Sequence, residues 1–306
     1  MNDAPTISVV IPTFNRSGSL DRVLTALDAQ DPVPGGFEIL VVDDGSTDDT
    51  AATVARHPAA SYLAQANAGP AAARNRGWRA ATADLIAFTD DDTAPARGWL
   101  VELVAAFQQD PPPDAVGGTV VAMQPGFLAD FVQLEGQVHH RVDEEGHVRY
   151  LVTANAAWRR NALAALRGFD ETFAIASGED TDLSMRAREA GMALTIADGA
   201  EVAHDHRATL RNVLSTFRKH GRSREQVVAA NPEMEWSRRR RALLGPGHWI
   251  GRYRTYRHGG CGRLRAAAYL GIRAMGLGAY AVGVMEASRL SRRADHARPP
   301  SQVPGT

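Results

Sequence analysis

Short apolar runs alternate with helix-like segments through the first half of the chain, and this alternation limits the fold more than any other feature. The runs at 7–11, 37–42 and 85–88 are β-branched or aliphatic and short enough to form one buried strand each. Between them, apolar residues recur three and four positions apart, most clearly over 20–27. Such repeats predict an α/β fold in which helices flank a mostly parallel central sheet.

Charge divides the chain, although the 306 residues together carry a net charge of only -1. Residues 1–206 contain 30 Asp and Glu against 14 Arg, whereas residues 207–306 contain 20 Lys and Arg against five acids. An acidic body suits a bound divalent cation, and a basic region suits an anionic surface or substrate. We therefore expect a main domain over 1–230, a basic helical C-terminal extension over 231–288 and a disordered tail over 289–306.

Cysteine content and the N-terminal sequence bear on the compartment. The single cysteine, Cys261, excludes an internal disulfide and a cysteine-rich zinc site. The first residues lack the basic segment and apolar stretch of a secretory signal, so we expect a cytoplasmic protein.

The basic C-terminal region suggests attachment to a membrane. Its apolar segment 266–287 contains Arg273 and several glycines, which favours a helix at an anionic membrane surface over one that crosses the bilayer. The alternative is a packed helix with its arginines in solvent. The arginine run 238–241 lacks interleaved aromatic residues, so no nucleic acid is expected.

Acidic side chains follow two of the predicted strands. Asp43 and Asp44 end one strand, while Asp90, Asp91 and Asp92 follow another. The carboxyl ends of parallel strands share one edge of the sheet, where ligands usually bind. Adjacent carboxylates repel one another unless a cation neutralises them, and the Asp-x-Asp pair Asp90 and Asp92 suits Mg²⁺ or Mn²⁺. The alternatives are a solvated loop for the triplet and a capped turn for Asp43 and Asp44.

Two further groups could carry chemistry. Glu179 and Asp180 open a predicted helix, so they either stabilise its N-terminus or provide a general base for an acceptor hydroxyl. His204 and His206 follow a short strand at a spacing that turns both rings to one side. Either histidine could complete a metal shell with Asp92, and the alternative is a pair of ordinary surface histidines.

Taken in order, these motifs resemble the inverting family 2 glycosyltransferases, which have a GT-A nucleotide-sugar-binding fold. The resemblance covers about residues 6–225. It rests on segments 10–16 (VIPTFNR), 41–48 (VVDDGSTD), 67–75 (NAGPAAARN), 88–92 (FTDDD), 155–171 with GFDE at its end, and 178–183 (GEDTDL).

The resemblance implies a role for each matching residue. The implied nucleotide-sugar contacts are Pro12, Thr13, Asn15, Arg16, Asp43, Asp44, Arg74, Asn75, Asp90 and Asp91. Within this set Asp91 either contacts the donor or points to solvent. The implied ligands of Mg²⁺ or Mn²⁺ are Asp90, Asp92 and His204, with His206 as the alternative histidine. Asp180 is the implied catalytic base, and Glu179 is the competing choice.

The implied function is a metal-dependent inverting glycosyltransferase of the hexosyltransferase type. It would move a sugar from a nucleotide-diphosphate donor to a hydroxyl of a glycan, a lipid-linked acceptor or a small molecule. Cell-envelope polysaccharide, glycolipid and natural-product glycosylation are the expected contexts. A sugar-1-phosphate nucleotidyltransferase would need a glycine-rich basic loop that residues 12–16 do not supply. A non-catalytic nucleotide-sugar binding module would not need the acidic motif at 179–180.

Overall fold

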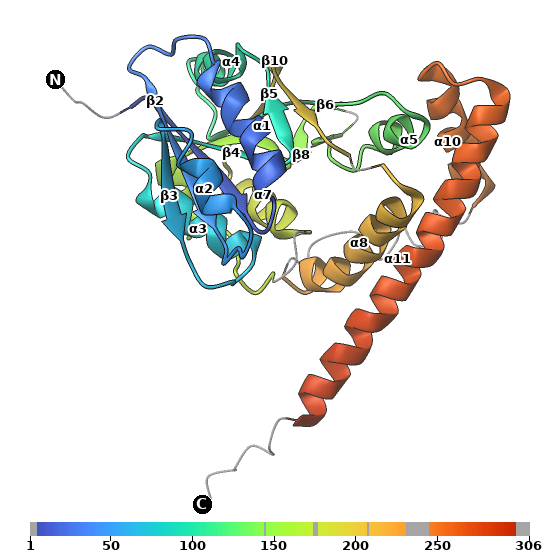
Figure 1. Ribbon diagram of the computed structural model, residues 1–306. Coiled ribbons are helices and arrows are strands. Elements are labelled where there is room, and N and C mark those ends of the chain that lie inside the picture. The colour runs from blue at the N-terminus through green and yellow to red at the C-terminus, as the bar shows by residue number, and fades with distance from the viewer. Residues whose placement is uncertain (1–4, 144, 174–176, 207, 231–244, 298–306) are drawn as a thin grey trace, which may run out of the picture. The chain divides into compact units, whose positions relative to one another are not determined.

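The computed structural model describes residues 5–143, 145–173, 177–206, 208–230 and 245–297 (Figure 1). The chain forms two compact units, residues 1–208 and residues 209–306. The first unit has an eight-stranded sheet in the order β3-β2-β1-β4-β9-β6-β10-β5. Its strands are β1 (Ile7–Thr13), β2 (Phe37–Asp43), β3 (Ala60–Ala64), β4 (Leu85–Thr89), β5 (Thr93–Pro95), β6 (Ala115–Ala122), β9 (Asn155–Arg159) and β10 (Leu194–His204). A separate hairpin pairs β7 (Arg141–Val142) with β8 (Val148–Tyr150).

The α/β architecture expected from the sequence is confirmed. The pairs β1–β2, β2–β3, β1–β4 and β6–β10 are parallel, whereas β9 runs antiparallel to β4 and β6, and β5 antiparallel to β10. Strands β5 and β9 were not expected, because three residues and an alanine-rich pentapeptide lack the β-branched run that marks a strand.

Helices cover both faces of the sheet. They are α1 (Ser17–Asp28), α2 (Thr50–Val54), α3 (Pro70–Ala80), α4 (Trp99–Ala106), α5 (Phe127–Glu135), α6 (Arg160–Ala165) and α7 (Glu179–Glu189). Along β1, Ile7, Val9 and Ile11 join one core cluster with α1 and α4. Val10 joins the other cluster with α3, α6 and α7. This period of two is what a strand buried on both faces requires.

Helix α3 lies unusually close to β1 because it contains Gly77. A Cβ atom at Gly77 would lie 2.3 Å from Val10 Cγ1 and 3.1 Å from Val42 Cγ2. Any larger residue would therefore push the helix off the sheet. Gly77 therefore determines how closely α3 packs against β1 and β2.

The second unit contains α8 (Leu210–Ala230), α10 (Pro246–His258) and α11 (Arg263–Ala297). Helices α8 and α11 pack backbone to backbone, since a Cβ atom on Gly221 would lie 2.1 Å from the Tyr280 carbonyl oxygen. Helix α8 packs on α11, so the two compact units divide before α8. The domain boundary expected at 230/231 stays a prediction. Residues 289–297, expected to be disordered, continue α11, since no proline or glycine interrupts them. Residues 231–244 and 298–306 lie outside the described residues.

The ring of His140 gives a testable pH dependence of stability. Its Nε2 lies 2.7 Å from the Gly118 carbonyl oxygen, and its Nδ1 accepts the Val152 N–H at 2.9 Å. Desolvation lowers the pKa of His140 to about 4. Because the unfolded chain accepts a proton that the folded ring resists, the free energy of unfolding should fall as pH drops from about 6.5 towards 4.

The measurement is urea unfolding of wild type and His140→Gln at pH 7.5 and pH 5. The free energy of unfolding of the variant should fall less between the two pH values, although it should be lower than that of wild type at pH 7.5. Four other histidines have lowered pKa values: His139, His206, His220 and His248. They are present in both proteins, so their own titration largely cancels in the comparison. An equal loss in both proteins would rule out His140 as the titrating group.

Candidate active site

The loop after β1 and the loop after β2 meet at the carboxyl edge of the sheet. Thr13 and Asp43 are register partners at the ends of these parallel strands. Beyond them, the Thr47 N–H donates to Asn15 Oδ1 and the Asn15 N–H donates to Ser46 Oγ, each at 2.8 Å. The two motifs that the resemblance assigns to the nucleotide therefore lie side by side.

Asp43 and Asp44, at the end of β2, both accept hydrogen bonds from nearby segments of the protein. The Tyr62 hydroxyl donates to Asp43 Oδ2 at 2.5 Å, and together with burial this contact raises the pKa of Tyr62 to about 12. Asp44 accepts the N–H groups of Ala68 and Gly69, each at 2.8 Å, and so fixes the turn before α3. Sequence reasoning missed Tyr62, because no motif links it to an aspartate 19 positions earlier.

Asp91 points into the protein, so of its two alternatives the one in which it faces solvent is wrong, and contact with the donor stays a prediction. Its residue is 4% exposed, Oδ2 accepts the Thr13 hydroxyl at 2.9 Å, and Oδ1 lies 2.7 Å from Arg16 Nη1. Burial raises the pKa of Asp91 to about 6, against the opposing charge of Arg16. The same Arg16 nitrogen lies 3.1 Å from Asp92 Oδ2. Asp91 thus anchors an arginine beside the next carboxylate.

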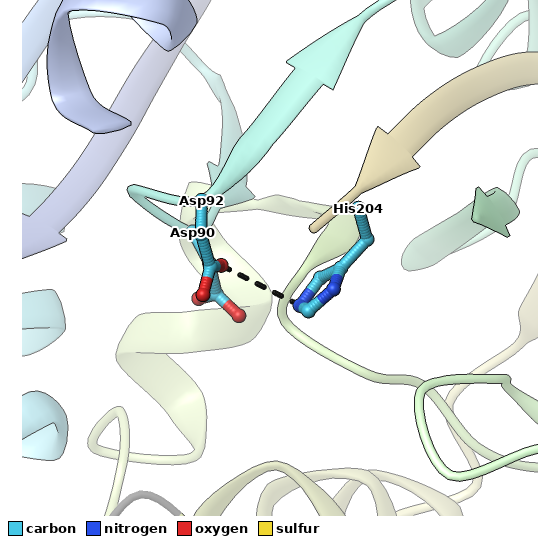
Figure 2. A group of neighbouring side chains, drawn as sticks. All are labelled: Asp90, Asp92 and His204. Atoms are coloured by element: carbon cyan, nitrogen blue, oxygen red, sulfur yellow. Dashed lines mark ion pairs between the residues drawn. The ribbon is translucent and has the colours of Figure 1, made fainter. Parts of the chain in front are cut away.

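Asp90, Asp92 and His204 bring one potential ligand atom each within 4.8 Å of one another (Figure 2). His204 Nε2 lies 3.4 Å from Asp92 Oδ1. The sheet causes this approach, because His204 ends β10 opposite Thr93 of the antiparallel strand β5, which follows Asp92. Two carboxylates and one imidazole suit Mn²⁺ or Mg²⁺, with ligand oxygens from elsewhere completing the shell.

His206 lies behind His204. Its Nδ1 is 3.2 Å from His204 Nδ1, and its Nε2 is 3.0 Å from Gln133 Oε1 on α5. Desolvation and the neighbouring His204 lower the pKa of His206 to about 4. Of the two histidines, His204 therefore belongs to the triad of Asp90, Asp92 and His204. His206 contacts the Nδ1 atom of the His204 ring, while Nε2 of that ring faces Asp92.

The acidic motif opens α7, directly after Gly178. Glu179 is 3% exposed, whereas Asp180 is partly exposed and accepts its neighbour's N–H, that of Thr181, at 2.7 Å. Burial raises the pKa of Glu179 to about 7 and raises that of Asp180 above its usual value. Asp182 differs from both, because it pairs with Arg186 at 2.8 Å within the helix.

Helix α3 ties the acidic motif to the triad. Arg74 Nη2 lies 2.8 Å from Asp90 Oδ1, and Nη1 lies 2.8 Å from Glu179 Oε1. The next residue, Asn75, donates to the Phe169 carbonyl oxygen and to Glu171, and it accepts from the Trp78 indole. Arg74 and Asn75 are only 3% and 1% exposed, so their contacts here are to protein. Contact of either with the ribose or diphosphate stays a prediction.

The family described as glycosyl transferase family 2 matches residues 8–167. The chain belongs to this family. Pre-mycofactocin glycosyltransferase of Mycobacterium tuberculosis is 35% identical over 244 residues, which cover 74% of this chain and 48% of that protein. Validoxylamine A glucosyltransferase of Streptomyces hygroscopicus is 29% identical over 284 residues, 79% of this chain and 61% of that protein. The chain thus spans about half to three fifths of the length of these relatives.

Solved structures of low sequence identity share the fold. The mannosyltransferase PcManGT from Pyrobaculum calidifontis, in complex with GDP-Man and Mn²⁺, has a TM-score of 0.60 at 20% identity and covers 96% of this chain and 80% of its own. S. aureus TarS in complex with UDP-GlcNAc has a TM-score of 0.55 at 17% identity, over 94% of this chain and 92% of its own. The GT-A fold expected from the sequence is confirmed.

Asp92→Asn tests the triad. The change removes one negative charge at nearly constant shape, so we expect Mn²⁺ to bind at least about tenfold more weakly, a loss typical of damaged metal shells. The measurement is a thermal-shift panel with UDP, GDP, dTDP and CMP, with and without Mn²⁺. Wild type should show a nucleotide-selective rise that needs Mn²⁺, because a ligand of the folded state raises the midpoint.

Glu189→Gln is the matched control, because it neutralises an exposed carboxylate in the last turn of α7. This control should keep the wild-type shift. An undiminished Mn²⁺-dependent shift in Asp92→Asn would remove Asp92 from the metal site.

Proposed function

We propose that this chain is a metal-dependent inverting glycosyltransferase of the hexosyltransferase type, which uses a nucleotide-diphosphate sugar. The observation that carries the proposal is the junction of the Asp90, Asp92 and His204 triad with the α7 carboxylates through Arg74. Names of the relatives support sugar transfer, and the complexes of PcManGT and TarS support a nucleotide-sugar donor.

The donor would lie along the carboxyl edge of the sheet. Pro12, Thr13, Asn15 and Arg16 would line the nucleotide pocket, with Asp43 or Asp44 near the base. Arg16 suits the diphosphate, because its side chain is 39% exposed and lies beside Asp92. Asp90, Asp92 and His204 would hold Mg²⁺ or Mn²⁺, which when bound offsets the charge that develops on the leaving diphosphate.

Asp180 would act as the general base. As the bond between the anomeric carbon and the diphosphate oxygen breaks, that carbon gains oxocarbenium character. An acceptor hydroxyl attacks the opposite face and gives its proton to the Asp180 carboxylate, so the configuration inverts. Because the pKa of Asp180 is raised, activity should increase with pH above the usual titration range of aspartate.

Asp180→Asn should lower kcat by about 10²–10⁴-fold, the usual contribution of a general base, and leave donor affinity nearly unchanged. Initial rates of sugar transfer and the thermal shift with nucleotide and Mn²⁺ measure the two effects. Glu189→Gln is the control, since it neutralises an exposed carboxylate on the same helix. Wild-type turnover in Asp180→Asn would exclude Asp180 as the base.

The acceptor is a hydroxyl-bearing glycan, lipid-linked molecule or small molecule. The relatives named for pre-mycofactocin and validoxylamine A support trying acceptors of those kinds first. Cell-envelope polysaccharide and glycolipid remain the other proposed contexts.

We further propose that the second unit attaches the protein to the cytosolic face of an anionic membrane. Among the described residues, α11 alone is long and apolar enough to cross a bilayer, over Arg263–Arg289, and only 22% of its apolar 18-residue window is buried. Between Arg263 and Arg289, its exposed residues carry no charge, and they recur every three or four positions along one face. They are Leu264, Ala267, Ala268, Gly271, Ala274, Met275, Gly278, Ala281, Val282 and Met285.

The neighbouring helix favours a surface position for α11. Helix α8 packs along α11 and carries Arg218, Lys219 and Arg222, which are too costly to place in the hydrocarbon core. Arg218 and Arg222 both pair with Glu286 of α11, so the negative charge of this glutamate is offset. The apolar face would lie in the headgroup region with the arginines towards anionic lipid.

Val282→Glu tests this attachment. A charge in the middle of the apolar face should weaken binding to anionic vesicles by about tenfold, because the apolar isopropyl group of Val282 is lost and a carboxylate must stay solvated. Co-sedimentation with vesicles of phosphatidylcholine and phosphatidylglycerol measures the effect. Thr255→Glu adds the same charge at an exposed position of α10 and should change binding little. Equal losses in both variants would mean that net charge alone governs attachment.

A further inference from the structure

Arg74 of α3 and Glu179 at the start of α7 form a buried ion pair, and Arg74 also contacts Asp90, which follows β4. The Arg74 guanidinium contacts Asp90 Oδ1 with one terminal nitrogen and Glu179 Oε1 with the other, each at 2.8 Å. The side chains of Arg74 and Glu179 are each 4% exposed. The guanidinium also lies 5.8 Å from the centre of the Phe169 ring, in cation–π range.

This geometry leaves Arg74 no face for a phosphate. Both terminal nitrogens contact protein carboxylates, and the remaining nitrogen, Nε, is buried with no hydrogen-bond partner in the part of the chain described. Bidentate phosphate binding needs two adjacent N–H groups that can be reached from solvent. Arg16, whose side chain is 39% exposed, meets that requirement better.

Glu179 is equally unsuited to meet an acceptor hydroxyl. One oxygen contacts Arg74, and the other, Oε2, is buried without a hydrogen-bond partner among the described residues. A general base must come within hydrogen-bond reach of the proton it removes. Asp180, the next residue, is partly exposed and meets that condition.

Resting on the proposed glycosyltransferase function, we propose that Arg74 and Glu179 are positioning residues that hold Asp180 at a fixed place relative to Asp90. Three carboxylates, those of Asp90, Glu179 and Asp180, repel one another in a poorly solvated region. The guanidinium between two of them offsets this repulsion and fixes α7 against β4. Neither Arg74 nor Glu179 touches the donor or the acceptor.

The test compares Arg74→Gln, Arg74→Lys, Glu179→Gln and Asp180→Asn, with Arg79→Gln as control. Arg79 lies on the same helix, and its exposed side chain pairs with Glu171 at 3.4 Å. The readouts are kcat, KM for the acceptor, the dissociation constant of the nucleotide with Mn²⁺, and the free energy of unfolding in urea.

A positioning role predicts a distinct set of effects. Asp180→Asn should lower kcat by about 10²-fold or more, and Glu179→Gln by less than about tenfold, because the amide keeps its contact with Arg74. Arg74→Gln should lower kcat by about 10- to 100-fold with the nucleotide dissociation constant within about threefold of wild type. Arg74→Lys should recover part of that loss, since an ammonium can reach one of the two carboxylates. Arg79→Gln should resemble wild type.

The double variant Arg74→Gln/Glu179→Gln tests whether the pair acts as one unit. Its kcat and its unfolding free energy should be no lower than those of Arg74→Gln alone, because Glu179→Gln removes the buried carboxylate that Arg74→Gln leaves unpaired. Additive losses would overturn the proposal. If Arg74→Gln does not fold, Arg74→Lys with Glu179→Gln supplies the same cycle.

Three other outcomes are decisive. A loss in Glu179→Gln as large as in Asp180→Asn would make Glu179 the base. A nucleotide dissociation constant raised about tenfold in Arg74→Gln, with kcat kept, would make Arg74 a donor contact. If wild type transfers no sugar from any donor, the proposed function fails, while the unfolding cycle still reports whether Arg74 and Glu179 are coupled.

Discussion

Repulsion among carboxylates at one edge of the sheet is the constraint around which the first unit is arranged. Two arginines offset it from different elements: Arg16 contacts Asp91 and Asp92, while Arg74 contacts Asp90 and Glu179. Each arginine spans two carboxylates and so keeps side chains from distant parts of the chain in register. The edge still holds more acids than arginines, which is the electrostatic condition that a divalent cation satisfies.

The sequence was informative wherever local pattern determines structure. Apolar runs and helical spacing predicted the α/β fold, and the order of motifs predicted which loops would meet. The choice between His204 and His206 could not be made from spacing, because it depends on the antiparallel contact of β10 with the three-residue strand β5. The inward direction of Asp91 likewise depends on Thr13 and Arg16, more than 70 positions away in the chain.

The second unit follows a different packing rule. Its two long helices meet at glycines, where the backbone of one helix closely approaches the backbone of the other: Gly221 lies against Tyr280, and Gly283 lies against Arg218. Such contacts consume little apolar surface, so the remaining apolar side chains of α11 are left facing outwards. The glycines of these helices allow α11 to pack closely on α8 while an uncharged face of α11 stays exposed.

Gly77 lies outside the candidate active site but affects the positions of residues within it. Gly77 determines how closely α3 packs on β1. It therefore also determines the positions of Arg74 and Asn75, three and two residues earlier on the same helix. A methyl group at position 77 would displace α3, and with it the contacts of Arg74 to Asp90 and Glu179. Substitutions at position 77 would consequently reduce turnover as active-site substitutions do, although Gly77 lies on the sheet side of α3, against the side chains of Val10 and Val42.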